Sequence, residues 1–118
     1  MELETVMLDR SEGIALIRMN RPREMNTLNF QLTRDLLRAL EISWDDASTK
    51  VVIVTGTGKA FCAGGDVATF RSAADMGDAT RQMTKDFDPL ISGIRRMAKP
   101  VIAMVNGICM GAGLSLAA

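Results

Sequence analysis

Apolar and polar residues alternate along two short stretches near the start of the chain. Residues 3–8 and 14–20 have the period of two that is typical of β-strands. The Ser-Glu-Gly sequence at 11–13 favours a turn, so the pattern predicts a β-hairpin. Proline cannot extend a ladder of hydrogen bonds, and we therefore expect the second strand to end at the Arg-Pro pair at 21–22.

The next stretch has the periodicity of a helix with one apolar face. Asn29 is suited to cap the start of this helix, because its side-chain oxygen can accept from a free amide of the first turn. The apolar stripe consists of Leu32, Leu36, Leu37, Leu40 and Trp44, and the polar side of Asp35, Arg38, Glu41 and Asp45. We expect the helix to end near Asp46.

Two later runs are apolar without alternation. Residues 51–55 and 101–105 are short and bounded by turn-forming residues, which is typical of strands covered on both faces in a parallel sheet. Between them we expect a short helix from Val67 and a longer helix over residues 78–97. Pro89 lies inside the longer helix and predicts a kink or a break there.

The predicted elements follow one another as hairpin, helix, strand, helices, strand and a last helix over residues 111–118. This order predicts an α/β layered fold, and no linker divides residues 1–118 into separate domains. The last helix lacks a Gly, Lys or Pro stop signal, and an isolated helix of that length is marginal. We therefore expect the sequence to continue beyond Ala118.

Composition narrows the classes of function. The 118 residues are 47% hydrophobic and carry 14 basic and 14 acidic side chains, as in an ordinary globular domain without net charge. A neutral chain with 4% aromatic residues and no tyrosine argues against nucleic-acid binding. No run of about 18 apolar residues occurs, so no membrane span is expected. The absence of histidine excludes Ser-His-Asp and Cys-His catalysis within this sequence.

The two cysteines, Cys62 and Cys109, lie far apart in the sequence and lack the C-x-x-C spacing of a metal or redox motif. We interpret both as small buried apolar residues rather than as reactive thiols. Neither a disulfide framework nor a metal site is expected, and this use of cysteine favours a cytoplasmic location.

The Gly-Thr-Gly-Lys sequence at 56–59 follows a predicted strand and suggests a phosphate-binding loop. Ile53 stands where a Walker A loop needs its first glycine, and Phe61 stands where a dinucleotide-binding motif needs its third. The segment is therefore interpreted as a turn that leaves a buried strand. A nucleotide-binding α/β domain stays open as a weaker alternative, which saturable NAD or ATP binding would favour.

Small residues are concentrated where two predicted strands give way to helices. These segments are F-C-A-G-G-D at 61–66 and N-G-I-C-M-G-A-G at 106–113. Small side chains allow a ligand to approach the main chain, and amides at a helix start are free to donate hydrogen bonds. Two amides directed at one point would form an oxyanion hole, which suits carbonyl or thioester chemistry.

Both segments resemble signatures of the crotonase (enoyl-CoA hydratase/isomerase) superfamily, F-x-A-G-x-D and N-G-x-x-x-G-[GA]-G. Residues 20–28 are similar to its N-R-P-x-x-x-N-x-L segment, and residues 51–56 to its third strand. The similarity runs in order over nearly all of the chain. It implies a crotonase-like (ClpP/crotonase) ββα spiral of which residues 1–118 form the N-terminal part, and a homo-oligomer, either a trimer or a dimer of trimers.

By this resemblance, the backbone N–H groups of Gly65 and Ala112 bind the thioester oxygen of an acyl-CoA substrate and stabilise an enolate. Coenzyme A enters as part of the substrate, and no permanently bound cofactor is expected. The residues expected to contact it are Arg23, Met25, Lys59, Ala60, Ala63, Gly64 and Asp66. Arg23 and Lys59 would meet its phosphates, although each is equally well a solvated surface cation. Asp66 is interpreted mainly as a helix N-cap.

Ser115 departs from the pattern of the hydratases, which carry a glutamate at this position. Adding water across a double bond needs two carboxylates, and a serine without a partner is no base near neutral pH. The sequence therefore looks more like the isomerase branch, which includes the isomerase of ring-epoxidised phenylacetyl-CoA and uses a single carboxylate, here expected beyond Ala118. Two interpretations stay open, an enoyl-CoA isomerase or hydratase (lyase) relative and a non-catalytic acyl-CoA-binding module or inactive fragment.

Overall fold

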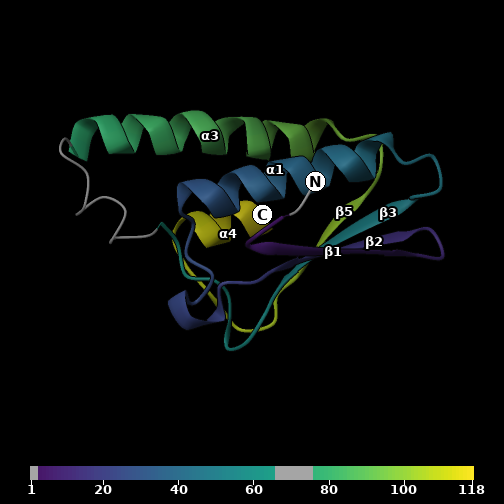
Figure 1. The fold of residues 1–118 in the computed structure, drawn as a ribbon, viewed down its shortest axis with the longest axis horizontal. Helices are drawn as coiled ribbons and strands as arrows, with labels where there is room; N and C mark the ends of the chain where they lie inside the picture. Colours follow the sequence, from purple (N-terminus) through teal and green to yellow (C-terminus); the bar gives the residue numbers. More distant parts are fainter. Residues whose placement is uncertain (1–2, 66–75) are drawn as a thin grey trace.

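The computed structural model describes residues 3–65 and 76–118. A four-stranded sheet with the order β1-β2-β3-β5 lies beneath two helices, α1 and α3, and a second sheet pairs β4 with β6 (Figure 1). The elements in chain order are β1 (Val6–Ser11), β2 (Ile14–Met19), the 3-10 turn η1 (Pro22–Glu24), α1 (Phe30–Asp45), β3 (Val51–Gly56), β4 (Ala60–Cys62), α3 (Met76–Arg96), β5 (Val101–Met104), β6 (Ile108–Cys109) and α4 (Ala112–Ala117).

The main sheet confirms the predicted hairpin and the parallel strands that follow it. β1 and β2 pair antiparallel with Val6 opposite Met19, and β2 and β3 pair parallel. β5 then pairs parallel with β3 and forms the edge of the sheet. The expectation that β5 is covered on both faces is wrong, because Ile102 and Met104 are 50% and 48% exposed. Successive side chains of a strand point to opposite faces of the sheet, and the face that carries Ile102 and Met104 is open to solvent.

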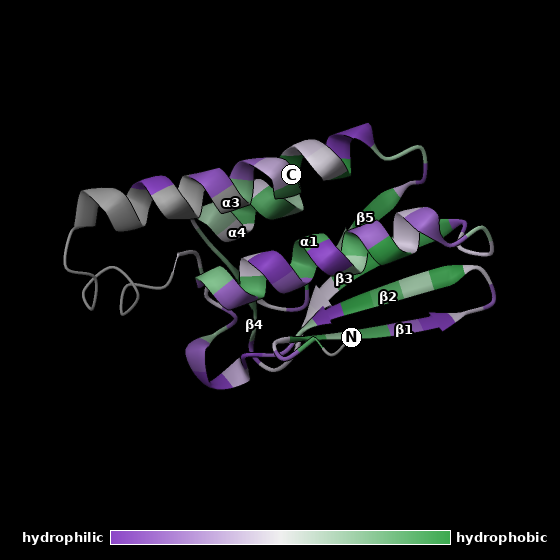
Figure 2. Ribbon diagram, turned by 45° about the horizontal axis from the view of Figure 1, so that its top comes forward, coloured by the Kyte–Doolittle hydropathy of each residue, from purple (hydrophilic) through white to green (hydrophobic). Residues whose placement is uncertain are grey.

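Helix α1 forms as its apolar stripe predicts. Asn29 caps it, its side-chain oxygen accepting from the Leu32 amide at 2.8 Å. Leu32, Leu36 and Leu40 of the stripe are buried in a core whose strand residues are hydrophobic in Figure 2. The expectation is wrong for Trp44, which is 43% exposed, and Leu37 is only partly buried. The placement of Asp35 on the polar side is wrong, since this residue is buried. Its carboxylate accepts hydrogen bonds from the Thr5 amide at 2.9 Å and the Thr5 hydroxyl at 2.7 Å, which offsets the cost of burial.

Helix α3 runs without a break through Pro89, so of the kink or break predicted at this residue the break is wrong. Proline removes one hydrogen bond of the helix, but apolar residues on both sides of it are packed. Leu90 is fully buried, and Phe87 and Ile94 pack against the core. No helix within the described ranges is long and apolar enough to cross a membrane. The short helix expected from Val67 lies outside the described residues.

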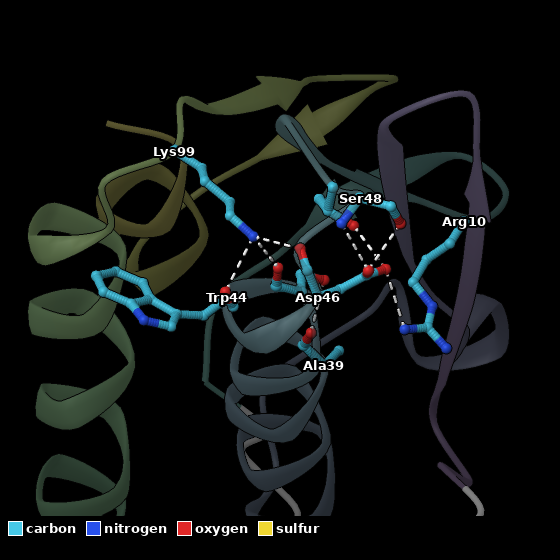
Figure 3. A network of polar contacts seen from close by, with 8 residues as sticks. Arg10, Ala39, Trp44, Asp46, Ser48 and Lys99 are labelled. Atoms are coloured by element: carbon cyan, nitrogen blue, oxygen red, sulfur yellow. Dashed lines mark hydrogen bonds and ion pairs between the residues drawn. The ribbon is translucent and has the colours of Figure 1, made fainter.

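The C-terminal end of α1 is joined to three other parts of the fold (Figure 3). The Asp46 carboxylate accepts hydrogen bonds from the Ser48 hydroxyl at 2.7 Å and amide at 3.0 Å, and pairs with Arg10 of β1 at 3.2 Å. These hydrogen bonds from Ser48, aided by Thr49 and by the charge of Arg10, lower the pKa of Asp46 to about 2. The carboxylate is therefore ionised at neutral pH and fixes the turn into β3.

Lys99 occupies the other side of the same helix end. Its Nζ donates to the backbone oxygens of Ser43, Trp44 and Asp46 at 2.8, 2.9 and 2.7 Å. The last carbonyls of a helix lack partners within the helix and carry a partial negative charge, so an ammonium group there satisfies both needs. Because Lys99 lies two residues before the first residue of β5, this contact fixes where that strand begins relative to α1.

Replacing Lys99 with methionine is expected to lower the free energy of unfolding by about 1–2 kcal/mol, since three carbonyls lose a charged donor that is partly open to solvent. Urea unfolding monitored by the fluorescence of Trp44 measures the change. Lys50→Met is the matched control, because Lys50 Nζ makes one long contact of 3.5 Å with the Ala47 carbonyl. An equal effect of both substitutions would contradict the assignment.

Candidate functional site

The second sheet brings together the two glycine-containing segments. β4 and β6 pair in parallel, and neither strand was predicted from the sequence, which indicated loops there. The Ile108 amide donates to the Lys59 carbonyl at 3.2 Å, and the Met110 amide donates to the Cys62 carbonyl at 3.1 Å. Segments 59–65 and 107–113, nearly fifty residues apart in the chain, therefore lie side by side at the end of the main sheet.

Two glycines make this close approach possible. A Cβ atom at Gly107 would lie 2.0 Å from the Lys59 carbonyl oxygen, and one at Gly113 would lie 2.1 Å from the Cys62 carbonyl oxygen. Such contacts are far too short for any side chain. Gly64 also lies at the junction where segments 59–65 and 107–113 meet. Its φ is positive, at 112°, and a Cβ atom there would lie 3.9 Å from the Ala112 nitrogen.

The peptide group between Gly64 and Gly65 is held by its carbonyl. The Gly64 oxygen accepts from the Leu28 amide at 2.7 Å, beside an isolated parallel bridge between Leu28 and Gly65. In a planar trans peptide the N–H points opposite to the C=O. The Gly65 N–H is therefore directed away from Leu28.

The same reasoning orients the peptide group between Gly111 and Ala112. The Gly111 oxygen accepts from the Leu114 amide at 3.0 Å and from the Ser115 amide at 3.3 Å, so it points into α4. The Ala112 N–H must then point out of the helix. Neither this amide nor that of Gly65 donates a hydrogen bond to any residue in the described ranges. Two unengaged donors thus lie on adjoining segments.

Asn26 holds the loop between β3 and β4 from one side. It is fully buried, and its side-chain oxygen accepts from the Arg21 amide at 2.8 Å. Its amide group donates to the Thr57 carbonyl at 3.1 Å and to the Ala60 carbonyl at 2.9 Å. A buried amide with these bonds satisfied fixes both the segment that contains it and the loop that it contacts.

Asn106 holds the same loop from the other side. Its amide group donates to the carbonyls of Gly58 and Ala60, both at 3.1 Å, and its oxygen accepts from the Gly56 amide at 3.0 Å. The Ala60 carbonyl is therefore shared by Asn26 and Asn106. Sequence reasoning missed this positioning role. The only signal was that each asparagine lies in a segment that carries the family resemblance.

The other predicted contacts are placed around this junction. Ala63 donates from its amide to the Met25 carbonyl at 3.1 Å, which joins η1 to the loop after β4. Arg23 and Lys59 are both exposed, whereas Ala60 is buried and offers no side-chain surface. Gly64 is at the junction itself. Asp66 lies outside the described residues.

Comparison with known proteins identifies the family. The profile of the family described as enoyl-CoA hydratase/isomerase matches residues 9–118. The chain belongs to the enoyl-CoA hydratase/isomerase family. The architecture is accordingly the crotonase fold, as the two glycine signatures predicted.

Curated members of the enoyl-CoA hydratase/isomerase family with different activities are similar to this chain. It is 38% identical to the mitochondrial 3-hydroxyisobutyryl-CoA hydrolase of Gallus gallus over 116 residues, which cover 94% of the chain and 29% of the hydrolase. It is 35% identical to the crotonyl-CoA hydratase of Syntrophomonas wolfei over 118 residues, covering 99% of the chain and 45% of the hydratase. The chain thus spans less than half the length of either relative.

Solved structures of the family superpose closely on the chain. An enoyl-CoA hydratase/carnithine racemase from Magnetospirillum magneticum gives a TM-score of 0.90 at 34% identity, over 98% of this chain and 44% of that one. A monofunctional enoyl-CoA isomerase from M. smegmatis gives 0.76 at 38% identity, over 96% of this chain and 46% of that one. Hydratases and isomerases both match, so the likeness does not select one reaction.

Substituting Gly113 with alanine is expected to cost at least about 2 kcal/mol of stability, because the new methyl group meets a backbone carbonyl that cannot rotate away. Gly93→Ala is the matched control. Gly93 lies in α3, where the position of a Cβ atom is open space. Alanine there should stabilise the chain by roughly 0.5–1 kcal/mol. Thermal unfolding of both variants checks the contrast, and a tolerated Gly113→Ala would refute the close packing.

Proposed function

We propose that the amides of Gly65 and Ala112 together bind the carbonyl oxygen of a coenzyme A thioester. The observation that supports this most directly is the orientation of their two peptide groups, each of which engages its carbonyl in the fold and leaves its N–H directed outward. Glycine at positions 64, 107 and 113 gives the two segments their close approach. A thioester oxygen needs just such a pair of fixed donors.

The chemistry follows from where charge collects. Removing a proton next to a thioester carbonyl gives an enolate, and its negative charge lies mainly on the oxygen. Two preorganised donors stabilise that charge without having to reorient, and loss of one such donor typically costs about a hundred- to a thousand-fold in rate. The same donors would stabilise the oxyanion formed by attack on the thioester carbonyl, so they suit the hydrolase chemistry of one relative as well as enolate chemistry.

The rest of the coenzyme A molecule is proposed to lie along η1 and the loop from Lys59 to Gly64. Arg23 and Lys59 provide exposed positive charge for its phosphates. The hydrogen bond from the Ala63 amide to the Met25 carbonyl holds η1 against this loop. Met25 is 39% exposed and Met110 is 58% exposed, and these adaptable apolar side chains suit contact with the acyl and pantetheine chains.

Among the reactions of the family, we favour double-bond isomerisation over hydration by a pair of carboxylates. Ser115 is the reason, because it occupies the position at which the resemblance places a glutamate in hydratases, and it is exposed here. Isomerisation needs one group that removes a proton and returns it elsewhere. We also propose a homo-oligomer in the cytoplasm, with the acyl-CoA substrate as the small-molecule partner and no permanent cofactor.

A module that binds acyl-CoA without converting it is the second candidate. It is favoured by the same serine and by the lack of histidine, which leave no evident base in the described residues beside the two amides. Incubation with a trans-3-enoyl-CoA, alongside a binding titration, separates the two. Formation of the trans-2 isomer supports an enzyme, whereas saturable binding without product, in a chain that also carries the carboxylate expected beyond Ala118, supports the module.

Ala112→Pro tests the proposed donor directly. Proline lacks the N–H but suits the first position of a helix, and Gly111 before it has the backbone freedom that the pair requires. We expect the dissociation constant for butyryl-CoA, measured by calorimetry, to rise roughly two- to tenfold, which is the worth of one hydrogen bond. The infrared frequency shift that the thioester carbonyl undergoes on binding should also become smaller in this variant.

Two controls make this result specific to the carbonyl oxygen. Ala112→Gly keeps the N–H and should bind butyryl-CoA as the unsubstituted chain does. Coenzyme A without an acyl group has no thioester oxygen, so Ala112→Pro should leave its affinity unchanged. An Ala112→Pro variant that binds butyryl-CoA with full affinity and full carbonyl shift would refute the proposed role.

A further inference from the structure

The two cysteines of the chain face each other across the second sheet. Cys62 of β4 and Cys109 of β6 are register partners in the parallel pair, although they are 47 positions apart in the sequence. Both are free thiols, Cys62 fully buried and Cys109 partly buried. Cys62 belongs to the apolar core and Cys109 packs against it, so both side chains lie on the core side of the second sheet. The sequence predicted two small apolar residues far apart in the chain, and their pairing across the sheet adds a proximity that it did not indicate.

The spacing of paired strands suits a bond between these residues. Neighbouring strands lie about 4.8 Å apart, within the range of about 4.4 to 6.8 Å that separates the Cα atoms of disulfide-linked cysteines. The contact of both side chains with the apolar core places them on the same face despite the register shift between Ala60 and Cys62. The Cβ atoms must close to about 3.8 Å. Strands of three and two residues with an irregularity between Ala60 and Cys62 have little ladder to resist that movement.

We propose that Cys62 and Cys109 form a dithiol modification site that small-molecule disulfides oxidise to an intramolecular disulfide. The partly exposed Cys109 thiol loses its proton and attacks the small disulfide, which forms a mixed disulfide and releases one small thiol. The Cys62 thiol then loses its proton and attacks the Cys109 sulfur, releasing the second small thiol. Two thiols of the protein are oxidised, and one small disulfide is reduced to two small thiols.

The second step is the slow one. Burial raises the pKa of the Cys62 thiol, and the neighbouring Cys109 adds to the rise, while the backbone of Gly64 opposes it in part. Little thiolate is therefore present at Cys62 near neutral pH, and the thiolate is the attacking species. The mixed disulfide on Cys109 accumulates first and is converted faster as the pH rises.

The bond would tie together the two segments that meet at the candidate site. Gly65 lies three residues after Cys62, and Ala112 lies three residues after Cys109. A disulfide at this position joins β4 to β6 covalently where Met110 now donates to the Cys62 carbonyl. The disulfide requires only the register and burial of the two cysteines, so its formation can be tested independently of the thioester proposal.

Oxidised glutathione is the probe. The reduced native chain is incubated with it at mildly alkaline pH, and intact mass and free-thiol titration are followed over time. We expect a transient adduct of one glutathione, then a monomer that has lost two hydrogens, with free thiols falling from two to none. A peptide map should contain the Cys62–Cys109 link, and dithiothreitol should restore both thiols.

Single substitutions supply the matched controls. Cys62→Ser should keep one glutathione on Cys109 indefinitely, and Cys109→Ser should stay unmodified while folded, because Cys62 is buried. Cys62→Ala and Cys109→Ala replace the serine variants if circular dichroism shows that either serine variant is unfolded. A stable glutathione adduct on Cys109 of the unsubstituted chain, disulfide-linked dimers only, or no reaction of either thiol would each overturn the proposal.

Discussion

Direct contact between two backbone segments is the constraint on which the candidate site depends. The carbonyls of Lys59 and Cys62 lie where any side chain at Gly107 or Gly113 would have to be, so the segments can meet only without one. Once they meet, the hydrogen bonds that hold the Gly64 and Gly111 carbonyls leave the next amide of each directed outward. Both donors are thus backbone N–H groups, which explains how a chain lacking histidine can present a polar site.

The local features of the fold could be predicted from the sequence because their causes are local. The alternation of apolar and polar residues predicted the hairpin, and an N-cap followed by an apolar stripe predicted α1. Short apolar runs predicted the parallel strands β3 and β5. The pattern of small residues also located the two segments that meet, and the family resemblance named the fold. The order of the elements then predicted the α/β layered fold, because that order restricts how such a sheet can be built.

Three features were missed for a different reason, since each depends on a partner far away in the sequence. Asp35 lies at a polar position of its helix but is buried, because Thr5, which directly precedes β1, donates two hydrogen bonds to its carboxylate. The pairing of β4 with β6, and with it the register of the two cysteines, depends on the crossing of segments that no periodicity describes. Asn26 and Asn106 read as ordinary polar residues, yet both donate to the carbonyl of Ala60.

The central claim is that the amides of Gly65 and Ala112 act together on one oxygen atom. Titrating the isotope-labelled chain with butyryl-CoA while following backbone amide-proton chemical shifts tests it most directly. A hydrogen bond to an oxygen moves an amide proton downfield, so both protons should move downfield along the same binding curve, and neither should do so with coenzyme A alone. Movement of only one proton, or equal movement with coenzyme A alone, would contradict the account.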